Sequence, residues 1–433
     1  MNCTAKNFIA IIVAGGFGSR IKKYSNLPKC LFKFKKKSLL ELIYNNLINY
    51  KIKDITLLSH YKSHLISKFI KIKNLKINLT KETKPLGTAG CLNLVNTKKK
   101  YFLIIFGDLL FKLNFKNLIN YHFFKKSDLT VLAHPNSHPF DSDLINHDAN
   151  YRIRNILKKP HNKNLIYSNL VMAGVFIVNK NMLKYITNKK KSDFTKDFIA
   201  SLIKKRKKIF AMVSREYCKD MGTPERYLST LKDYKNNFHN KYSANRKIPV
   251  IFLDKDGVIN EDLGPFKYSN PLNMFSEVPS ALKLINNSNY LSIVITNQPH
   301  VAKGFITIKN LLLSFKKLET FLGNKNIYLD KIFYCPHHPN LGYPGEIKSL
   351  KIKCSCRKPD IGLFFKAHKE FNIDFKRSYF IGNSEVDYNA ALNCGVKPII
   401  IRNKLFNVKG VIKKDNLLQA VEYILKKRIS NNF

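Results

Sequence analysis

Two aspartates stand two residues apart, directly after an apolar run, in the stretch Val250-Ile251-Phe252-Leu253-Asp254-Lys255-Asp256-Gly257. The apolar and β-branched run predicts a buried parallel strand, and Gly257 lets the chain turn sharply away from its carboxyl end. Ligands of open α/β sheets bind at that edge, so both carboxylates are placed to meet one. The alternative is an acidic turn that closes an ordinary strand, and the residues that follow argue against it.

Cysteines and histidines farther along have the spacing of a metal site. Cys335-Pro336-His337-His338 and Cys354-Ser355-Cys356 give a Cys-x-His pair, sixteen intervening residues and a Cys-x-Cys pair. Three thiolates and one imidazole fill a tetrahedral Zn²⁺ site with no open position, which is typical of a structural site. The predicted ligands are Cys335, His337, Cys354 and Cys356. Buried free cysteines are the alternative, and the preference for His337 over His338 rests partly on the resemblance given below.

Two further strands are predicted to end in polar residues at the same edge as the aspartates. Leu291–Ile295 runs into Thr296-Asn297-Gln298-Pro299, and Ser378–Ile381 runs into Gly382-Asn383-Ser384-Glu385-Val386-Asp387. Between them, the predicted zinc loop ends at Arg357-Lys358-Pro359, so loss of the metal should disorder a cation of the site. In this order, over about residues 248 to 405, these segments resemble the haloacid dehalogenase-type phosphatases.

The resemblance implies a role for each of these side chains. Asp254 would attack phosphorus and Asp256 would act as general acid and base, while Thr296 and Lys358 hold the phosphoryl oxygens and Asn297 and Arg357 bind substrate. Mg²⁺ would be held by Asp254, the carbonyl of Asp256, Asn383 and Asp387. Asn383 stands where the family usually has an aspartate, so we expect an unusually high Mg²⁺ requirement unless Glu385 or Asp387 compensates.

The cysteine-rich insert narrows the resemblance. It is similar to that of D,D-heptose-1,7-bisphosphate phosphatases and of the related histidinol-phosphate phosphatases. Thr296-Asn297-Gln298-Pro299 and Gly342-Tyr343-Pro344-Gly345-Glu346 resemble the heptose enzymes, particularly those that act on the α-anomer.

The first half of the chain has a glycine-rich loop after a predicted strand, Phe8–Val13. The loop reads Ala14-Gly15-Gly16-Phe17-Gly18-Ser19-Arg20, in which glycines allow backbone amides to approach phosphates and Arg20 adds a forked cation. The later segments, in order, are Leu27-Pro28-Lys29, Glu82 to Gly90, the strand Tyr101–Phe106 before Gly107-Asp108, Ala173-Gly174, and Asp220 to Glu225. Over about residues 6 to 235, this series resembles the sugar-1-phosphate nucleotidyltransferases.

That family joins a sugar 1-phosphate to an NTP and releases pyrophosphate, a reaction that depends on alignment and charge neutralisation. The resemblance implies that Arg20 and Lys29 meet the phosphates and that Asp108 and Asp220 hold Mg²⁺. The residues expected to contact the nucleotide are Gly15, Gly16, Gly18, Ser19, Glu82, Gly87 and Thr88. Glu82 could accept the N–H groups of guanine or could instead pair with Lys81 or Lys84, and each of these residues could be a structural turn residue.

Two departures put sugar recognition in doubt. Lys158-Lys159-Pro160 replaces the usual Glu-Lys-Pro, so that the phosphate-binding Lys159 remains and the sugar-binding carboxylate is missing. Met172-Ala173-Gly174 replaces the usual Asn-Ala-Gly. Altered specificity and loss of activity both stay open.

The 433 residues therefore predict two α/β, Rossmann-like three-layer domains, at 1–235 and 248–433, joined by a polar linker at 236–247. The net charge of +47 comes from lysines scattered among many Asn and Ile residues, which suggests codon drift toward A/T rather than a polyanion site. No run of eighteen apolar residues and no signal-peptide layout is evident. We expect a cytoplasmic protein that binds neither nucleic acid nor membrane, and the oligomeric state stays open.

A phosphatase and a nucleotidyltransferase on one chain make chemical sense together. Removing the 7-phosphate of heptose 1,7-bisphosphate leaves heptose 1-phosphate, to which the first domain would attach a nucleotide. The leading hypothesis is a bifunctional enzyme that supplies NDP-heptose, with GTP as donor, for lipopolysaccharide or surface polysaccharide. The alternatives are a histidinol-phosphate-type phosphatase fused to a nucleotidyltransferase of other or lost sugar specificity, and a basic nucleic-acid-binding or scaffold protein with decayed sites.

Overall fold

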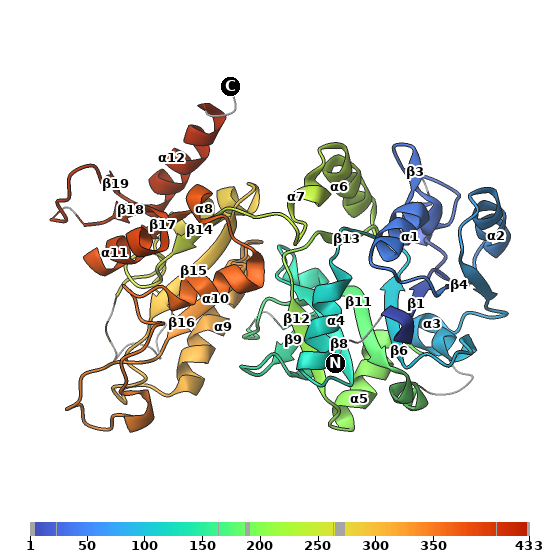
Figure 1. Cartoon of the computed structure of the whole chain (residues 1–433), viewed down its shortest axis with the longest axis horizontal. Coiled ribbons are helices and arrows are strands. Elements are labelled where there is room, and N and C mark those ends of the chain that lie inside the picture. The colour runs from blue at the N-terminus through green and yellow to red at the C-terminus, as the bar shows by residue number, and fades with distance from the viewer. Residues whose placement is uncertain are drawn as a thin grey trace. The chain divides into compact units, whose positions relative to one another are not determined.

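The computed structural model describes residues 5–22, 24–162, 164–186, 191–262, 264, 273–403 and 405–430. It separates into two compact units, each built around its own sheet (Figure 1). The first unit comprises Met1–His134, Asp143–Lys158 and Leu170–Ala244, and the second comprises Pro135–Ser142, Lys159–Asn169 and Asn245–Phe433. Two short segments that interrupt the first unit in sequence therefore belong to the second.

The sheet of the first unit is mixed. Within the described residues its strands follow the order β10 (Ile153–Leu157), β9 (Leu144–His147), β11 (Val171–Asn179), β6 (Tyr101–Phe106), β1 (Phe8–Val13), β4 (Ile55–Ser59) and β5 (Asn78–Lys81). β8 (Leu129–His134) pairs with β11 and with β12 (Ile209–Val213). The central strands β6, β1, β4 and β5 are parallel, and β11 runs antiparallel to β6.

Strand β1 shows why this sheet is covered on both faces. Alternate residues enter two different cores, with Phe8, Ala10 and Ile12 in one and Ile9 and Ile11 in the other. A parallel strand between two layers needs such a continuous apolar run. Helices α1 (Leu39–Asn49), α2 (Ser63–Ile72) and α4 (Phe115–Phe124) contribute to the first core, and α3 (Gly87–Gly90) and α5 (Ala200–Lys204) to the second.

The sheet of the second unit is parallel throughout its described strands. Their order is β16 (Lys331–Cys335), β15 (Leu291–Asn297), β14 (Val250–Leu253), β17 (Tyr379–Gly382), β18 (Lys397–Ile401) and β19 (Ile412–Lys414). Ile251 and Leu253 pack with α8 (Val278–Asn286), α9 (Ile308–Asn324) and α12 (Leu417–Ser430). On the other face Phe252 meets Phe364 of α10 (Gly362–Phe371), with ring centroids 4.9 Å apart. The predicted three-layer α/β class is confirmed in both units.

The stretch predicted as a linker contains ordered structure. Helix α6 (Pro224–Lys235) is followed by the short α7 (Phe238–Lys241). Phe238 and Tyr242 pack against the core of the first unit, which the polar composition around them did not reveal. The domain limits stay a prediction.

The inserted segments 135–142 and 159–169 pack on α9 inside the second unit. The backbone amide of Tyr167 donates to Thr320 Oγ1 at 2.9 Å, and its hydroxyl donates to Asn324 Oδ1 at 3.2 Å. A Cβ on Gly323 would lie 2.6 Å from the Tyr167 hydroxyl, so only glycine allows this approach. These contacts explain why the segments group with the second unit.

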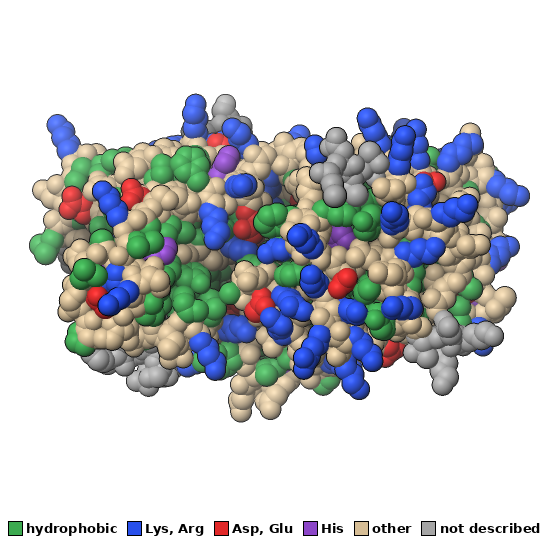
Figure 2. Space-filling view, turned by 60° about the horizontal axis from the view of Figure 1, so that its bottom comes forward, with side chains coloured by type: hydrophobic (Ala, Val, Ile, Leu, Met, Phe, Trp, Pro, Cys, Tyr) green, Lys and Arg blue, Asp and Glu red, His purple; other side chains and the backbone are tan. Residues whose placement is uncertain are grey.

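Figure 2 shows Lys and Arg side chains dispersed over the displayed face, with Asp and Glu among them. Among the described residues, none of the helices combines the length and apolar character that a membrane span requires.

Candidate active sites and metal centre

In the second unit, the carboxyl ends of β14 and β17 converge on Lys358. The amide of Asp254, directly after β14, donates to the carbonyl of Ile381 at 3.0 Å. The Lys358 ammonium lies 2.8 Å from Asp254 Oδ1 and 2.7 Å from Asp387 Oδ1. The side chains of Lys358 and Asp387 are only 2% and 1% exposed. The predicted nucleophile, the predicted cation and one carboxylate of the last motif thus form a single buried group.

Two carboxylates share one ammonium in this group. Burial, together with the charge of Asp387, raises the pKa of Asp254 to about 7 against the opposing effect of Lys358. Burial alone would lower the pKa of Lys358, but the two carboxylates raise it overall. When Asp254 is ionised, one negative charge stays uncompensated, and the carboxylate oxygens are of the hard type that Mg²⁺ prefers. The residues present therefore fit a magnesium ion.

Asn383 lies beside the loop that carries the two aspartates. A Cβ on Gly257, which has φ +80°, would come within 2.0 Å of Asn383 Nδ2. The backbone amide of Asn383 donates to Asp387 Oδ2 at 3.2 Å, and its carbonyl accepts from Asn403 at 2.9 Å. Asn383 is thus held against the predicted magnesium ligands, whereas Glu385 is exposed at the start of α11 (Glu385–Cys394).

Asp256 is surrounded by donors that sequence reasoning missed. Its Oδ1 accepts from Asn260 Nδ2 at 2.9 Å and from the buried Lys255 ammonium, and its Oδ2 accepts from Gln298 Nε2 at 2.8 Å. Gln298 Nε2 also donates to Thr296 Oγ1 at 3.0 Å. Burial would raise the pKa of Asp256, but Lys255 and these hydrogen bonds lower it overall. In the sequence, these donors were indicated only by the lysine between the two aspartates and by the glutamine that follows Thr-Asn.

Asn297 and Arg357 make hydrogen bonds that hold the loop on which Lys358 stands. Asn297 Oδ1 accepts from the Lys358 amide at 2.9 Å, and its Nδ2 donates to the Lys358 carbonyl at 3.1 Å. Arg357 donates to the carbonyl of His337 at 3.3 Å. Asn297 therefore fixes the backbone on which Lys358 stands, and its predicted contact with substrate stays a prediction.

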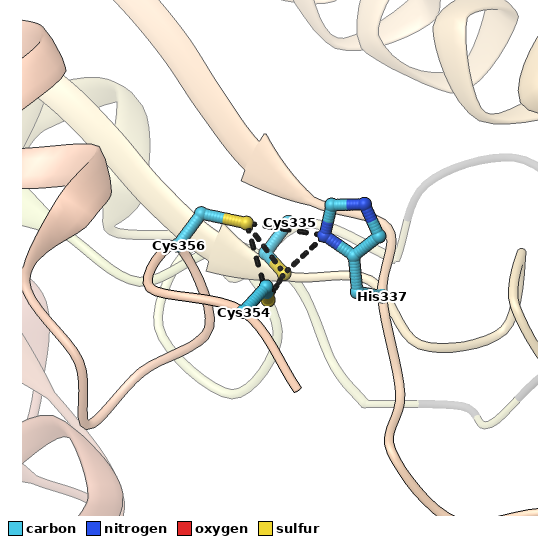
Figure 3. Close-up of side chains that lie close together, drawn as sticks. All are labelled: Cys335, His337, Cys354 and Cys356. Carbon is cyan, nitrogen blue, oxygen red and sulfur yellow. Dashed lines mark hydrogen bonds between the residues drawn. The ribbon is translucent and has the colours of Figure 1, made fainter. Parts of the chain in front are cut away.

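Figure 3 shows the four predicted zinc ligands pointing toward one another, with Cys335 at the end of β16 and Cys354 and Cys356 on the following loop. Their donor atoms all lie within 4.8 Å of one another, and no other such His, Cys, Asp and Glu group occurs in the described residues. Cys356 Sγ lies 3.2 Å from Cys335 Sγ and 3.2 Å from His337 Nδ1. Zinc bonds of about 2.3 Å would set the sulfur atoms about 3.8 Å apart. The residues therefore fit Zn²⁺ if the sulfur atoms move slightly away from one another.

His338 takes a different place. Its Nδ1 accepts from the amide of Asn340 at 3.3 Å, and its ring meets the Tyr343 ring edge-on with centroids 5.7 Å apart. The structure thus separates the adjacent histidines, with His337 turned toward the three sulfurs.

In the first unit, a two-stranded ribbon brings the predicted magnesium ligands side by side. β7 (Leu109–Phe111) pairs with β13 (Cys218–Asp220), with Asp220 opposite Leu109. Asp108 Oδ2 pairs with the Lys29 ammonium at 2.9 Å, and Arg226 donates to both oxygens of Asp220 at 3.1 and 3.0 Å. Arg226 was not predicted, and its only signal was its position in the first turns of the helix after Asp220.

The glycine loop lies against both Lys29 and Glu82. A Cβ on Gly18 would lie 3.5 Å from Lys29 Cε, and a Cβ on Gly15 would lie 2.5 Å from Glu82 Oε1. Glu82 Oε2 accepts the Leu86 amide at 3.0 Å. Across the described residues, Glu82 makes no ion pair with Lys81 or Lys84. One oxygen of Glu82 therefore stands beside the loop, as recognition of a base would require.

Other residues that were predicted to contact the nucleotide either make contacts within the protein or are exposed. Gly87, at φ +78°, lies so close to Ser192 that a Cβ would be 2.4 Å from its carbonyl oxygen. Thr88 Oγ1 accepts the Phe194 amide at 2.7 Å. Arg20, Ser19 and Gly16 are exposed. Lys159 belongs to the second unit, where it pairs with Asp141 at 2.9 Å.

Comparisons with known proteins point to two kinds of enzyme. A family model described as nucleotidyl transferase matches residues 9–237. The D-glycero-beta-D-manno-heptose-1,7-bisphosphate 7-phosphatase of Yersinia pestis is 30% identical over 178 residues, which cover 41% of this chain and 93% of that protein.

Two solved structures are also similar. HddC from Yersinia pseudotuberculosis has 24% identity and a TM-score of 0.46, covering 52% of this chain and 98% of that chain. The D,D-heptose 1.7-bisphosphate phosphatase from B. bronchiseptica, complexed with magnesium and phosphate, has 24% identity and a TM-score of 0.36, covering 42% of this chain and 99% of that chain.

Proposed function

We propose that this chain, which belongs to the nucleotidyl transferase family over residues 9–237 and also to the D-glycero-beta-D-manno-heptose-1,7-bisphosphate 7-phosphatase family, supplies an NDP-heptose. It is an enzyme that has a nucleotidyltransferase part and a phosphatase part. The phosphatase removes the 7-phosphate of D-glycero-D-manno-heptose 1,7-bisphosphate. The nucleotidyltransferase then joins the remaining heptose 1-phosphate to a nucleotide, with GTP as donor, for lipopolysaccharide or surface polysaccharide.

The observation that carries the phosphatase half is the buried group of Asp254, Lys358 and Asp387. Lys358 occupies Asp254 Oδ1, which leaves Oδ2 to attack phosphorus. Once ionised, a carboxylate whose pKa is raised to about 7 is a stronger nucleophile than an ordinary one. As the new P–O bond forms, the bond from phosphorus to the sugar oxygen breaks, and an aspartyl phosphate remains on Asp254.

Asp256 supplies the proton that the leaving sugar oxygen needs. In the free protein Lys255 and the neighbouring hydrogen bonds lower its pKa, so it is ionised. A phosphate dianion beside it adds negative charge, which opposes Lys255 and raises that pKa. Asp256 then protonates the leaving oxygen, and in the second step it accepts the proton of the water that attacks the aspartyl phosphate. When bound, Mg²⁺ would screen the repulsion between carboxylate and phosphate.

The nucleotidyltransferase half is supported by the two ion pairs on the β7–β13 ribbon. Lys29 and Arg226 neutralise Asp108 and Asp220 in the protein alone. Triphosphate oxygens compete with Asp108 for Lys29, which also touches the glycine loop. The entry of a nucleotide would thereby free Asp108, and with Asp220 it would hold Mg²⁺ at the reacting phosphate.

A coupled assay tests both halves. The protein is incubated with Mg²⁺, heptose 1,7-bisphosphate of either anomer and each NTP in turn, and phosphate, pyrophosphate and sugar nucleotide are followed. Both anomers are needed, because the relatives found are named for the β-anomer whereas the sequence motifs resemble α-specific enzymes. We expect phosphate first, followed by pyrophosphate and GDP-heptose with GTP.

Each half has its own contrary result. Absence of pyrophosphate with every NTP would refute the nucleotidyltransferase claim for heptose 1-phosphate. Faster hydrolysis of histidinol phosphate than of heptose bisphosphate would favour the alternative phosphatase. Tight DNA binding at physiological salt, without phosphatase activity, would favour a basic binding protein with decayed sites.

A further inference from the structure

The segment that follows β18 contacts the loop of Asn383. β18 and β17 are parallel neighbours, so the residues after each strand lie at the same edge of the sheet. Asn403 Nδ2 donates to the carbonyl of Asn383 at 2.9 Å, and Asn403 Oδ1 accepts from the amide of Phe406 at 3.0 Å. Asn403 therefore joins the loop after β17 to its own loop, with both ends of its side-chain amide engaged.

Arg402 anchors the turn from which the Asn403 side chain starts. Arg402 has φ +56°, a left-handed conformation that strains a residue with a side chain and persists only where other contacts hold it. Its guanidinium carbon lies 3.6 Å from the centroid of the Phe275 ring, and its nitrogens pair with Glu277 and donate to the Val258 carbonyl at 3.5 Å. Val258 lies in the loop of the two predicted catalytic aspartates. Arg402 and Asn403 together thus contact both loops that carry predicted magnesium ligands.

The backbone of Asn383 is held on both sides. Its amide donates to Asp387 Oδ2 at 3.2 Å, and its carbonyl accepts from Asn403. Its side chain packs so closely on Gly257 that a Cβ there would lie 2.0 Å from Nδ2. A neutral amide oxygen attracts Mg²⁺ more weakly than a carboxylate does, so its contribution to affinity depends on its being oriented in advance.

We propose that Asn403 is a positioning residue of the predicted magnesium site, which aligns the side chain of Asn383 by holding its carbonyl. The proposal rests on the proposed phosphatase function, and it gives a role to a loop that carries none of the predicted catalytic residues or ligands. Groups that orient a metal ligand without touching the metal typically contribute about 10- to 100-fold in affinity. Because Asn403 acts through Asn383, its effect should disappear when the Asn383 side chain is removed.

The test measures Mg²⁺ binding without catalysis. The full chain is titrated with Mg²⁺ by calorimetry in a D108N background, which removes a ligand of the other predicted magnesium site. N403A should raise the Mg²⁺ dissociation constant about tenfold. N383A keeps the charged ligands, and in that background N403A should change the constant by less than about twofold. A purely structural role of Asn403 would instead give the same factor with and without the Asn383 side chain.

Phosphate release gives a second readout, which separates the metal from the substrate. N403A should raise the Mg²⁺ concentration for half-maximal activity about tenfold, with an unchanged KM for heptose 1,7-bisphosphate at saturating Mg²⁺. F406A is the matched control, because it removes a ring whose centroid lies 5.3 Å from that of Tyr388 and keeps the backbone amide that donates to Asn403. It disturbs the same loop and should leave both Mg²⁺ constants unchanged, and the melting temperature of each variant checks that it is folded.

The contrary results distinguish the positioning role from the function. Unchanged Mg²⁺ binding in N403A, an equal change in F406A, or equal factors with and without the Asn383 side chain would overturn the positioning role. If the wild type does not hydrolyse heptose 1,7-bisphosphate at any Mg²⁺ concentration, the proposed phosphatase function fails, and calorimetry still decides whether Asn403 supports a magnesium site. Hydrolysis with unchanged Mg²⁺ constants in N403A leaves the function standing and refutes only the positioning role.

Discussion

The two predicted catalytic centres hold their carboxylates in opposite ways. In the second unit, Asp254 and Asp387 are buried and share the single ammonium of Lys358. In the first unit, Asp108 and Asp220 each have a cation of their own, and both pairs are partly exposed. The phosphatase centre therefore has negative charge to spare, whereas the nucleotidyltransferase centre is neutralised by the chain itself.

This difference determines what a ligand must do on arrival. Exposed ion pairs contribute about 0–1 kcal/mol each, so phosphates and a metal ion can replace Lys29 or Arg226 at little cost. Removing one partner of a buried pair costs about 3–5 kcal/mol, so the phosphatase group is fixed before substrate binds. The first centre adapts to its ligands, while the second is preformed and fits a cation.

The largest expected effect separates the two centres completely. D254N removes the predicted nucleophile, and loss of such a residue lowers kcat by a factor on the order of 10³ or more. Phosphate release from heptose bisphosphate should therefore disappear, while pyrophosphate release with heptose 1-phosphate and GTP continues. D108N should give the reverse pattern.

A matched control for D254N is D374N, because an asparagine at position 374 can still accept the hydrogen bond from the Arg377 amide that caps the short helix Phe375–Arg377. It should alter neither activity. If D254N abolished both activities, or if it left phosphate release intact, the assignment of one centre to each unit would be wrong.

Loss of the zinc ligands should damage only the preformed centre. C354S removes one of the four predicted ligands, and the loop that ends at Arg357 and Lys358 should lose its order. We expect about one equivalent of zinc to be lost per chain, with a large fall in phosphatase activity and unchanged nucleotidyl transfer. Metal analysis of the purified protein checks the first point, and the two activity assays check the others.

Cys394 is the control for this experiment, because it is buried in α11 outside the ligand group. C394A should keep its zinc. Full zinc content in C354S, or normal phosphatase activity without zinc, would contradict the structural role of the metal.

Much of the phosphatase centre could be predicted from sequence, because its residues follow strands that are apolar throughout. The predicted strand Leu291–Ile295 is part of β15, and the two aspartates follow β14 as expected. Parallel strands end at the same edge of the sheet. The residues that follow them therefore lie close together, regardless of how the rest of the chain folds. The side chains that surround Asp256, namely Lys255, Asn260 and Gln298, were missed because short-range sequence does not show which way a turn directs them.

The first centre was less predictable for a related reason. Its aspartates meet on a short ribbon between segments about a hundred residues apart, and Arg226 joins them from a helix. Ion pairs between distant surface residues leave no periodic pattern. Tyr167 likewise packs on α9 through contacts more than 150 positions away in sequence, which no local signal indicates.

A smaller effect should follow from restoring charge at Asn383. N383D adds a carboxylate beside the loop of Asp254 and Asp256, where the amide now lies. One extra charged ligand should lower the Mg²⁺ concentration for half-maximal phosphatase activity by about tenfold, since about 1.4 kcal/mol of binding corresponds to that factor. The measurement is a Mg²⁺ titration of phosphate release. N310D places the same charge on the exposed first turn of α9 and should not change the titration, and an equal shift in both variants would point to bulk charge instead.

The remaining prediction concerns stability and uses a buried acid in each unit. Burial raises the pKa of Glu216 in the first unit to about 7, and that of Glu319 in the second unit also to about 7. Glu216 Oε1 accepts from the amides of Asn114 at 2.7 Å and Ala244 at 3.4 Å, and Oε2 accepts from Ser214. Glutamine can keep these bonds, because its Oε1 accepts both amides and its Nε2 donates to the serine oxygen.

Because the folded protein holds these protons more tightly than the unfolded chain, their stabilising effect is complete below about pH 4.5 and is lost as pH rises through about 7. For Glu216 the loss amounts to at most about 3 kcal/mol. Amide hydrogen exchange of β1 and β6 at pH 5 and pH 8, corrected for intrinsic rates, should show this loss in wild type and not in E216Q. E319Q should reduce the corresponding loss only in the strands of the second unit, where Asp254, whose pKa is also raised to about 7, still contributes to it. If E216Q changed the pH dependence in both units, the two units would unfold together. The preformed centre and the adaptable centre could then not be changed independently of each other.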